Sequence, residues 1–407
     1  MSAKEEQRLQ VLNLVLEKRC TVGEAASLTG VSERHLWRLL AAYRRQGARA
    51  LVHGNRGRKP VHATPEEVRQ RVEELARGRY AACNYQHLTE LLEEREGLRL
   101  SHGSVWRILT AAGLPSPRRR RPPQHRCRRE RYPQEGMLLQ VDGSRHDWLQ
   151  GRGPWLTLLC AVDDATGTVP YALFREQEDA QGYFLLLQGV LDHKGIPLAL
   201  YSDRHSIFTV NPPRPLSLEE ELAGGPSATQ VGRALEQLGI RLILARSPQA
   251  KGRVERLFGT LQDRLVQELA LAGARTMKEA NAVLWAYLPG FNARFGVPAA
   301  QPGSAYQPVP EALDLEGLLC FHYERVVAVD NTVRFGRQTL QVLPDRDRLS
   351  YARARVLVQE RVDGTWWCSI RARPWSPGRR LRLPPSSGPG RGPGRRWRFL
   401  PHDSGAR

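Results

Sequence analysis

Apolar residues follow three different patterns along the chain. Near the N-terminus, apolar positions within residues 5–19 recur at helical spacing, which predicts an amphipathic helix. From residue 135 onward, short apolar runs alternate with helical stretches, as in a mixed α/β domain. Between residues 321 and 370 the runs become short and β-rich, separated by Asp-Asn and Asp-Gly turns. The pattern therefore predicts a multidomain protein with N-terminal helical units, a central α/β core and a small C-terminal β domain.

The first helical unit, expected over residues 1–57, has the spacing of a helix-turn-helix. Thr21 with Glu24 fits a capping box, Gly30 suits the turn, and Ser32 is placed to cap the next helix. The second helix of such a motif enters the major groove of DNA. An ordinary helical hairpin with a solvated basic face is the alternative. The candidate DNA contacts on the second helix are Arg34, His35 and Arg38.

A second helical unit is expected over residues 58–114. Residues 100–109 repeat the capped-helix pattern and end near Gly113, so this unit also reads as a helix-turn-helix. Two such units would bind a long, bipartite DNA site, whereas the alternative is a packing module that only spaces domains. A basic linker, residues 115–133, follows, and we expect its arginines to lie along phosphates unless they only keep the linker soluble. The candidate contacts in the linker are Arg118, Arg119, Arg120 and Arg121.

The central domain, expected over residues 134–300, begins with three strands and continues as alternating helices and strands. Apolar runs end at two acidic residues, Asp142 and Asp203, and Glu255 lies in the first turns of a later helix. Carboxylates suit hard cations such as Mg²⁺, and paired ions assist phosphoryl transfer. The expected strands are 137–141, 155–162, 169–174, 198–202 and 240–245, and the expected helices are roughly 177–193, 229–238 and 249–271.

Other titratable residues near strand ends compete with these three acids. Asp163 and Asp164 resemble turn residues, and Asp147 falls in an expected loop. His205 follows Asp203 closely, so it is a candidate for substrate contact, although histidines are more often structural.

The segment Ser247-Pro248-Gln249-Ala250-Lys251-Gly252-Arg253-Val254-Glu255-Arg256, taken with Asp142 and Asp203, resembles the DDE transposase and retroviral-integrase superfamily. The resemblance is greatest to ISNCY-type transposases of bacterial insertion sequences, and it extends from the N-terminal helices to about residue 372. It implies an RNase H-like core in which the first and fourth strands are neighbours. An insertion over residues 209–228 lengthens the interval before Glu255, and its role is open.

The resemblance also implies roles for individual residues. Asp142, Asp203 and Glu255 would be the catalytic residues and would bind two Mg²⁺ (or Mn²⁺) ions. Lys251, and with it Arg253 and Arg256, would contact phosphates near the site.

The composition of the chain indicates the kind of partner that it binds. The chain has a formal net charge of +19 and a pI near 10.3, which favours a polyanionic partner such as double-stranded DNA. Most of the excess is arginine, so nucleotide composition is an alternative cause. The six cysteines form no CxxC pair and suit a reducing bacterial cytoplasm, where the chain would be nucleoid-associated. We expect no secretion signal and no membrane span.

Residues 301–373 are expected to form a small five-stranded barrel. This barrel would hold DNA or a second subunit, or it would only pack against the core. Residues 374–407 are rich in Pro, Gly and Arg, and we expect a disordered basic tail.

The resulting hypothesis is a transposase that binds the ends of its own insertion sequence and catalyses metal-dependent strand cleavage and strand transfer into target DNA. Joining two ends implies a homodimer or a higher oligomer on DNA. One alternative is a sequence-specific DNA-binding regulator with an inactive integrase-like core. Another is a structure-selective nuclease of RNase H type. The sequence leaves open the terminal repeats, the target preference, whether one or both strands are cut, and whether this copy is active.

Overall fold

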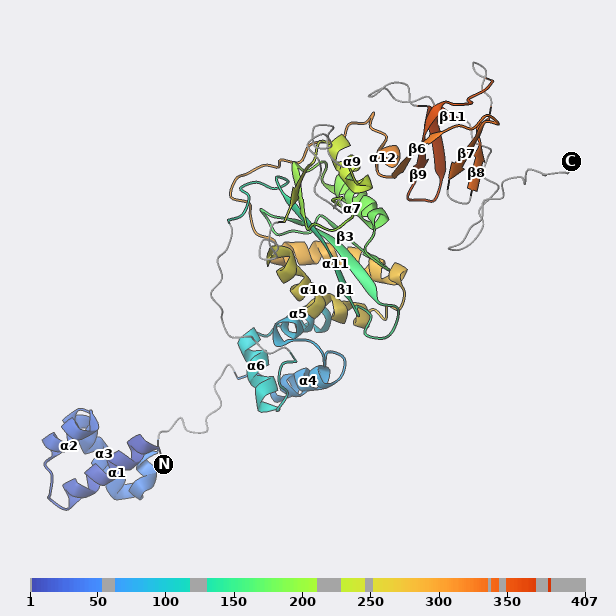
Figure 1. Cartoon of the computed structure of the whole chain (residues 1–407). Helices are drawn as coiled ribbons and strands as arrows, with labels where there is room; N and C mark the ends of the chain where they lie inside the picture. Colours follow the sequence, from blue (N-terminus) through green and yellow to red (C-terminus); the bar gives the residue numbers. More distant parts are fainter. Residues whose placement is uncertain are drawn as a thin grey trace. The chain divides into compact units, whose positions relative to one another are not determined.

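The computed structural model describes residues 2–52, 63–117, 130–210, 228–245, 252–335, 338–343, 349–370 and 380–381 (Figure 1). The chain divides into two compact units. The first consists of residues 1–75 and 98–113, and the second of residues 76–97 and 114–407. Across the described residues, no helix is both long enough and apolar enough to cross a membrane.

The first unit is helical, and its capping follows the prediction. Thr21 accepts a hydrogen bond from the Glu24 backbone N–H (3.3 Å), and Glu24 accepts one from the Thr21 backbone N–H (2.8 Å). Gly30 ends α2 in the left-handed region with φ of 64°, which glycine adopts without strain. Ser32 caps the next helix. The helices are α1 (Ala3–Leu16), α2 (Val22–Thr29), α3 (Glu33–Gln46), η1 (Gly47–Leu51), α4 (Glu66–Arg77) and α6 (His102–Ala111).

The second unit is built on a five-stranded mixed sheet with strand order β3-β2-β1-β4-β5. The first three strands pair antiparallel, and β4 and β5 extend the sheet in parallel with β1. The predicted α/β core, with its first and fourth strands as neighbours, is confirmed. The strands are β1 (Leu139–His146), β2 (Leu156–Asp163), β3 (Tyr171–Arg175), β4 (Ala199–Ser202) and β5 (Arg241–Leu244).

One strand boundary was wrong. The sequence predicts that β1 ends at Val141, but the strand continues to His146. Its polar second half pairs with β2 as far as His146 opposite Leu156, so backbone pairing overrides the change in side-chain polarity. Asp142 therefore lies inside the strand, not after it.

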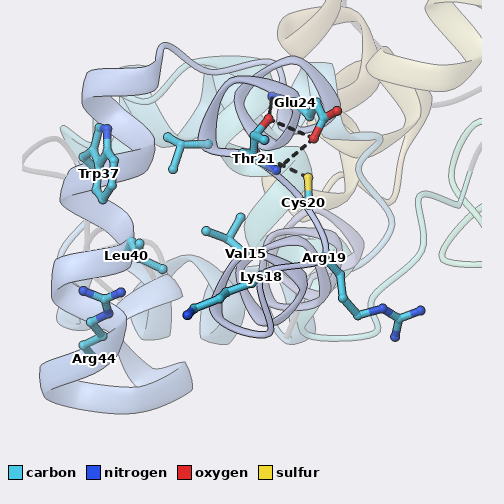
Figure 2. Close-up of a pocket in the computed structure, with 10 residues that line it drawn as sticks. Val15, Lys18, Arg19, Cys20, Thr21, Glu24, Trp37, Leu40 and Arg44 are labelled. Atoms are coloured by element: carbon cyan, nitrogen blue, oxygen red, sulfur yellow. Dashed lines mark hydrogen bonds between the residues drawn. The ribbon is translucent and has the colours of Figure 1, made fainter.

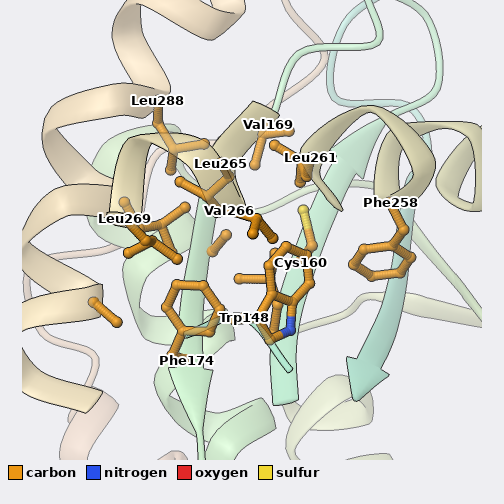
Figure 3. Packing of buried hydrophobic residues seen from close by; sticks show 14 of the residues in the cluster. Trp148, Cys160, Val169, Phe174, Phe258, Leu261, Leu265, Val266, Leu269 and Leu288 are labelled. Carbon is orange, nitrogen blue, oxygen red and sulfur yellow. The ribbon is translucent and has the colours of Figure 1, made fainter. Parts of the chain in front are cut away.

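Helices cover the two sides of this sheet with separate hydrophobic clusters. One cluster joins α10 and α11 to residues of β2 and β3 and to Trp148, whose ring meets Phe174 edge to face at 5.5 Å (Figure 3). The other joins α7 and α9 to β1 and β4. The helices are α7 (Ala180–His193), α9 (Gln230–Gln237), α10 (Gly252–Leu271) and α11 (Met277–Phe295).

The edge strand β3 is closed by side chains of α11. The Asn281 side chain pairs with both backbone groups of Phe174, accepting from its N–H (2.7 Å) and donating to its carbonyl (3.2 Å). Asn292 pairs in the same way with Val169, at 2.8 Å for each bond. An exposed edge invites pairing with another chain, and these amides occupy backbone groups that would otherwise be open.

Replacing Asn281 with Ala should destabilise the core unit by about 1–3 kcal/mol, because it leaves the backbone groups of the buried Phe174 without their partners. Chemical denaturation would measure the loss. The control is Lys278→Ala, an exposed position of the same helix, which should change stability by under about 0.5 kcal/mol. Equal effects of the two variants would contradict a role for Asn281 at this edge.

Helix α5 (Tyr85–Glu96) belongs with the core unit, although the sequence places it in a separate domain over residues 58–114. The Asn84 side chain at its start contacts Asp263 of α10. Glu90 on α5 pairs with Arg264 of α10 and Arg294 of α11. The catalytic-core unit therefore includes a helix that precedes the basic linker in sequence.

The C-terminal part contains two small sheets among its described residues. Strands β11, β10, β9 and β6 form one sheet and β7 pairs with β8, so a closed barrel is not seen. The basic tail lies outside the described residues. The elements are α12 (Leu315–Leu318), β6 (Phe321–Val326), β7 (Thr332–Phe335), β8 (Gln338–Gln341), β9 (Arg355–Glu360), β10 (Trp366–Ile370) and β11 (Arg380–Leu381).

Candidate catalytic site

The two strand acids lie on neighbouring parallel strands. In the pairing of β1 with β4, Gln140 is level with Tyr201. Continuing the same register by two residues places Asp142 level with Asp203, just beyond the end of β4. Both residues are partly exposed, so their carboxylates are accessible to solvent. The topology thus brings two acids that are distant in sequence to neighbouring positions near the carboxyl end of β4.

Glu255 lies in the first turn of α10 and is exposed. Two turns later, the Gln262 side chain donates a hydrogen bond to the Ser144 hydroxyl (3.2 Å), which joins α10 to the second half of β1. The buried Val254 and Phe258 on either side of Glu255 belong to the same cluster as Cys160, which lies opposite Asp142 in the sheet. These contacts hold the start of α10 against the part of the sheet that carries Asp142.

Sequence reasoning missed an acid that packs against Gly143, the residue that follows Asp142 in β1. Glu178 precedes α7, and its carboxylate lies against Gly143: a Cβ added to that glycine would meet it at 2.5 Å. The Tyr183 hydroxyl donates to Glu178 at 2.6 Å. Burial raises the pKa of Tyr183, and the charges of Glu178, Asp142 and Asp203 raise it further. The buried tyrosine therefore contacts the Glu178 carboxylate and feels the charges of both strand acids.

The sequence gives little indication of the contact between Glu178 and Gly143. Glu178 stands among other polar residues before the helix, and no spacing rule links it to Gly143. The ring of Tyr183 also meets Phe208 edge to face at 4.7 Å, five residues beyond Asp203. Tyr183 thus joins the segments that carry both strand acids.

The competing acids have structural partners. Asp163 and Asp164 are fully buried. Asp163 accepts hydrogen bonds from the backbone N–H groups of Gly136 and Thr166, each at 2.8 Å. Burial raises the pKa of Asp163, and these hydrogen bonds oppose the rise. Asp147 lies in a loop, as expected, and accepts from the Gly151 backbone N–H at 3.0 Å.

Arg253 has a partner other than phosphate in this structure. Its guanidinium donates to the buried carboxylate of Asp164 at 2.5 Å. Asp164 also accepts from Gln140 on β1 (2.6 Å) and from the Tyr132 backbone N–H (2.8 Å). Arg253 thus joins the start of α10 to the sheet, and its contact with DNA stays a prediction.

The remaining predicted contacts are divided between described and undescribed segments. Arg256 is exposed, and its Nε donates to the Gly252 carbonyl at 2.9 Å. Arg34 and Arg38 are exposed on α3 and His35 is half-buried, while His205 is exposed. Lys251, Arg118, Arg119, Arg120, Arg121 and most of the insertion over 209–228 lie outside the described residues.

The donor chemistry of the strand acids suits a hard divalent cation, because both offer carboxylate oxygens from adjacent positions. Within the described parts of the chain, however, no three His, Cys, Asp or Glu side chains are grouped closely enough to hold one ion. Asp142 and Asp203 thus offer ligands that suit a metal ion. Glu255 does not lie close enough to them, among the described residues, to complete a group of three ligands.

Fold and site together define an integrase-like catalytic core preceded by helical segments, the first of which is a helix-turn-helix. A helix-turn-helix domain model matches residues 7–60. A putative transposase of Sinorhizobium fredii (strain NBRC 101917 / NGR234), y4bF, is 37% identical over 345 residues, covering 84% of this chain and 73% of the relative. The transposase for insertion sequence IS1202 of Streptococcus pneumoniae is 32% identical over 402 residues, covering 90% of this chain and 84% of its own.

The chain belongs to the insertion-sequence transposases, within the DDE transposase and retroviral-integrase superfamily. It is therefore a DNA transposase, an enzyme of polynucleotidyl-transferase type that carries a helix-turn-helix domain. The catalytic core domain of HTLV-2 integrase has 18% identity and a TM-score of 0.26, covering 37% of this chain and 86% of its own. That likeness is too low to contribute, so the fold assignment depends on the strand order of the chain itself.

Proposed function

We propose that this transposase cuts DNA at the ends of its own insertion sequence and joins the cut ends to target DNA, using Asp142, Asp203 and Glu255. The observation that carries the proposal is the register of β1 and β4, which makes Asp142 and Asp203 neighbours. Glu255 supports it by its place at the start of the helix that packs beside them.

The three acids would hold two Mg²⁺ or Mn²⁺ ions. Such ions, when bound, lower the pKa of an attacking water or hydroxyl and stabilise the leaving oxygen at phosphorus. The chain itself supplies rigid placement: Asp142 comes from a strand paired on both sides, and Glu255 from a helix anchored by buried side chains. Lys251 and Arg256 would bind phosphates beside the scissile bond.

The partners would be double-stranded DNA of the element ends and of the target. Arg34, His35 and Arg38 would contact the ends through α3, and Arg118, Arg119, Arg120 and Arg121 would follow the backbone between units. Because two ends have to be joined, we propose at least a dimer on DNA.

Cleavage of a labelled duplex that carries the element's own end tests the proposal, with Mg²⁺ and with chelator. Metal-dependent nicking at the end, followed by joining of the 3′ end to a second duplex, would support it. Binding without cleavage in any metal would favour a regulator with an inactive core. Cleavage of hybrids without joining would favour a nuclease of RNase H type.

Glu178 and Tyr183 should also affect the site, because the Tyr183 hydroxyl holds the Glu178 carboxylate against Gly143, where it supports the strand next to Asp142. We expect Tyr183→Phe and Glu178→Gln to raise the Mg²⁺ concentration for half-maximal cleavage roughly tenfold, as the loss of supporting groups around metal ligands typically does. The rise in Tm on adding Mg²⁺ without DNA should shrink in parallel.

Tyr171→Phe is the matched control, because it removes the same atom from the ring that packs against Gly189 of α7. It should leave the Mg²⁺ requirement and the metal-dependent rise in Tm unchanged. If Tyr183→Phe and Glu178→Gln behave like this control, the pair only stabilises the fold.

A further inference from the structure

Helices α3 and α6 present the same surface pattern when positions are counted from their capping serines. Ser32 and Ser101 each accept a hydrogen bond from the backbone N–H three residues later, at 3.3 and 3.2 Å. The fifth residue after each serine is a tryptophan with about half of its surface exposed, and the sixth is an exposed arginine. These pairs are Trp37 with Arg38 and Trp106 with Arg107.

The buried sides of the two helices also correspond. The fourth and eighth residues after each serine are buried aliphatic side chains: Leu36 and Leu40 in α3, and Val105 and Leu109 in α6. A helix turns by about 100° per residue, so the arginine points away from this buried side and the tryptophan lies beside it. The Trp–Arg pair therefore occupies the outer face of each helix.

These tryptophans are not held in place by hydrogen bonds of their indole groups to other described residues. Among the described residues, neither indole N–H has a hydrogen-bond partner. By contrast, Trp148 and Trp285 in the core unit donate theirs to the carbonyls of Ser144 and Ala172. A large side chain left half exposed with an unused donor is typical of a binding surface, where tryptophan is enriched.

The surroundings of Trp37 indicate an anionic partner. Trp37 lines a hollow of about 430 Å³ together with Lys18, Arg19 and Arg44 (Figure 2). The one carboxylate in the lining, Glu24, is engaged in the capping box of α2. A hollow lined by cations and by a flat apolar ring suits the phosphates and sugars of a DNA strand.

The two helices share the residues of their outer faces, but they differ in the residues of their first turns. The three residues after the serine are Glu33, Arg34 and His35 in α3, but His102, Gly103 and Ser104 in α6. Residues at the N-terminus of a recognition helix contact base edges. Shared residues suit a contact that both sites have in common, whereas different first turns suit different base sequences.

We propose that Trp37–Arg38 and Trp106–Arg107 are the DNA-anchoring pairs of helices α3 and α6, which bind two subsites of different base sequence within one element end. This inference depends on the proposed function for its choice of DNA. Binding does not require cleavage, however, so failure of the catalytic proposal and failure of this one give different results.

The test is binding of the full chain to a labelled duplex from the element's end, combined with a nuclease footprint in chelator. Trp37→Ala and Trp106→Ala should each weaken binding about tenfold, and each should erase a different part of the footprint. Trp155→Ala, which alters a tryptophan 57% exposed in the core unit, is the control and should change neither.

Two further sets of variants test the division of roles. Arg38→Ala and Arg107→Ala should each reduce the slope of log affinity against log salt by about one, because each removes a phosphate contact. The triple variant Glu33→His, Arg34→Gly and His35→Ser should keep affinity for unrelated DNA but lose its preference for the subsite of α3.

Each outcome tests a different part of the proposal. An unchanged footprint in both Trp106→Ala and Arg107→Ala would overturn DNA binding by α6, and the same result for Trp37→Ala and Arg38→Ala would overturn it for α3. A loss in Trp155→Ala equal to that in the helix variants would overturn the assignment to these pairs. Circular dichroism of each variant checks that its helices are retained, and the arginine variants test the same pairs independently of the tryptophans.

Discussion

Replacing Glu255 with Gln is expected to lower the rate of strand cleavage by at least about 10³-fold while DNA binding is kept. Gln preserves the size of the side chain and removes only the negative charge, and a neutral amide is a poor ligand for a hard divalent cation. Glu255 is exposed at the start of α10, so the substitution disturbs no buried contact. The measurement is single-turnover cleavage of a labelled element end in Mg²⁺.

Asp142→Asn and Asp203→Asn should lower the cleavage rate by the same order. The three acids would act in one step, so the loss of any one of them removes the rate enhancement that they share. The matched control is Asp147→Asn, which changes an acid five residues after Asp142 in a loop and should leave the rate within about twofold. Gel-shift affinity for the same duplex should change little in all four variants. Full cleavage by Glu255→Gln would remove this residue from the site.

The sequence predicts which elements carry these acids, because strands and helices depend on local order. Apolar runs locate β1 and β4, and the resemblance to the integrase superfamily implies that they are neighbours. The predicted end of β1 was wrong because residues 143–146 pair with β2 through their backbone groups. The periodicity of side chains gives no information about this pairing.

Contacts between distant segments were not predictable in this way. The proximity of Glu178 to Gly143 depends on how α7 packs against the sheet, and no pattern in either segment signals it. The pairing of Arg253 with Asp164 is of the same kind, and it gives a residue expected at DNA a partner inside the protein. The buried leucines of α5, Leu88, Leu91 and Leu92, recur at helical spacing, but this spacing gives no information about the surface on which they pack.

The packing of α5 on α10 includes a buried ion pair that should be costly to break. Arg264 is only 5% exposed and donates to both carboxylate oxygens of Glu90. Its guanidinium also lies over the ring of Phe295, at 4.8 Å from the centroid. Burial alone would raise the pKa of Glu90, but hydrogen bonds from Arg264 and Gln86 and the charges of Arg264 and Arg294 lower it overall.

Arg264→Met should therefore lower the free energy of unfolding of the core unit by about 3–5 kcal/mol at neutral pH, because it leaves a partly buried carboxylate without its main partner. The pH dependence follows from the sign of the shift. A folded-state pKa below the unfolded value gives stability that is present at neutral pH and is lost as the pH falls through the folded pKa. The variant should therefore lose less stability on acidification than the native chain does.

The double variant Arg264→Met with Glu90→Leu should recover most of that loss, because two apolar side chains can replace a buried ion pair at little cost. Lys194→Met is the control: it breaks a pair with Glu135 whose side chains are 41% and 24% exposed, against 6% and 14% for Arg264 and Glu90, and it should cost under about 1 kcal/mol. Urea denaturation at neutral and acidic pH measures all four proteins. A double variant no more stable than Arg264→Met would mean that the arginine contributes through its packing on Phe295, and the charge pairing of α5 with α10 would then be incidental to the fold.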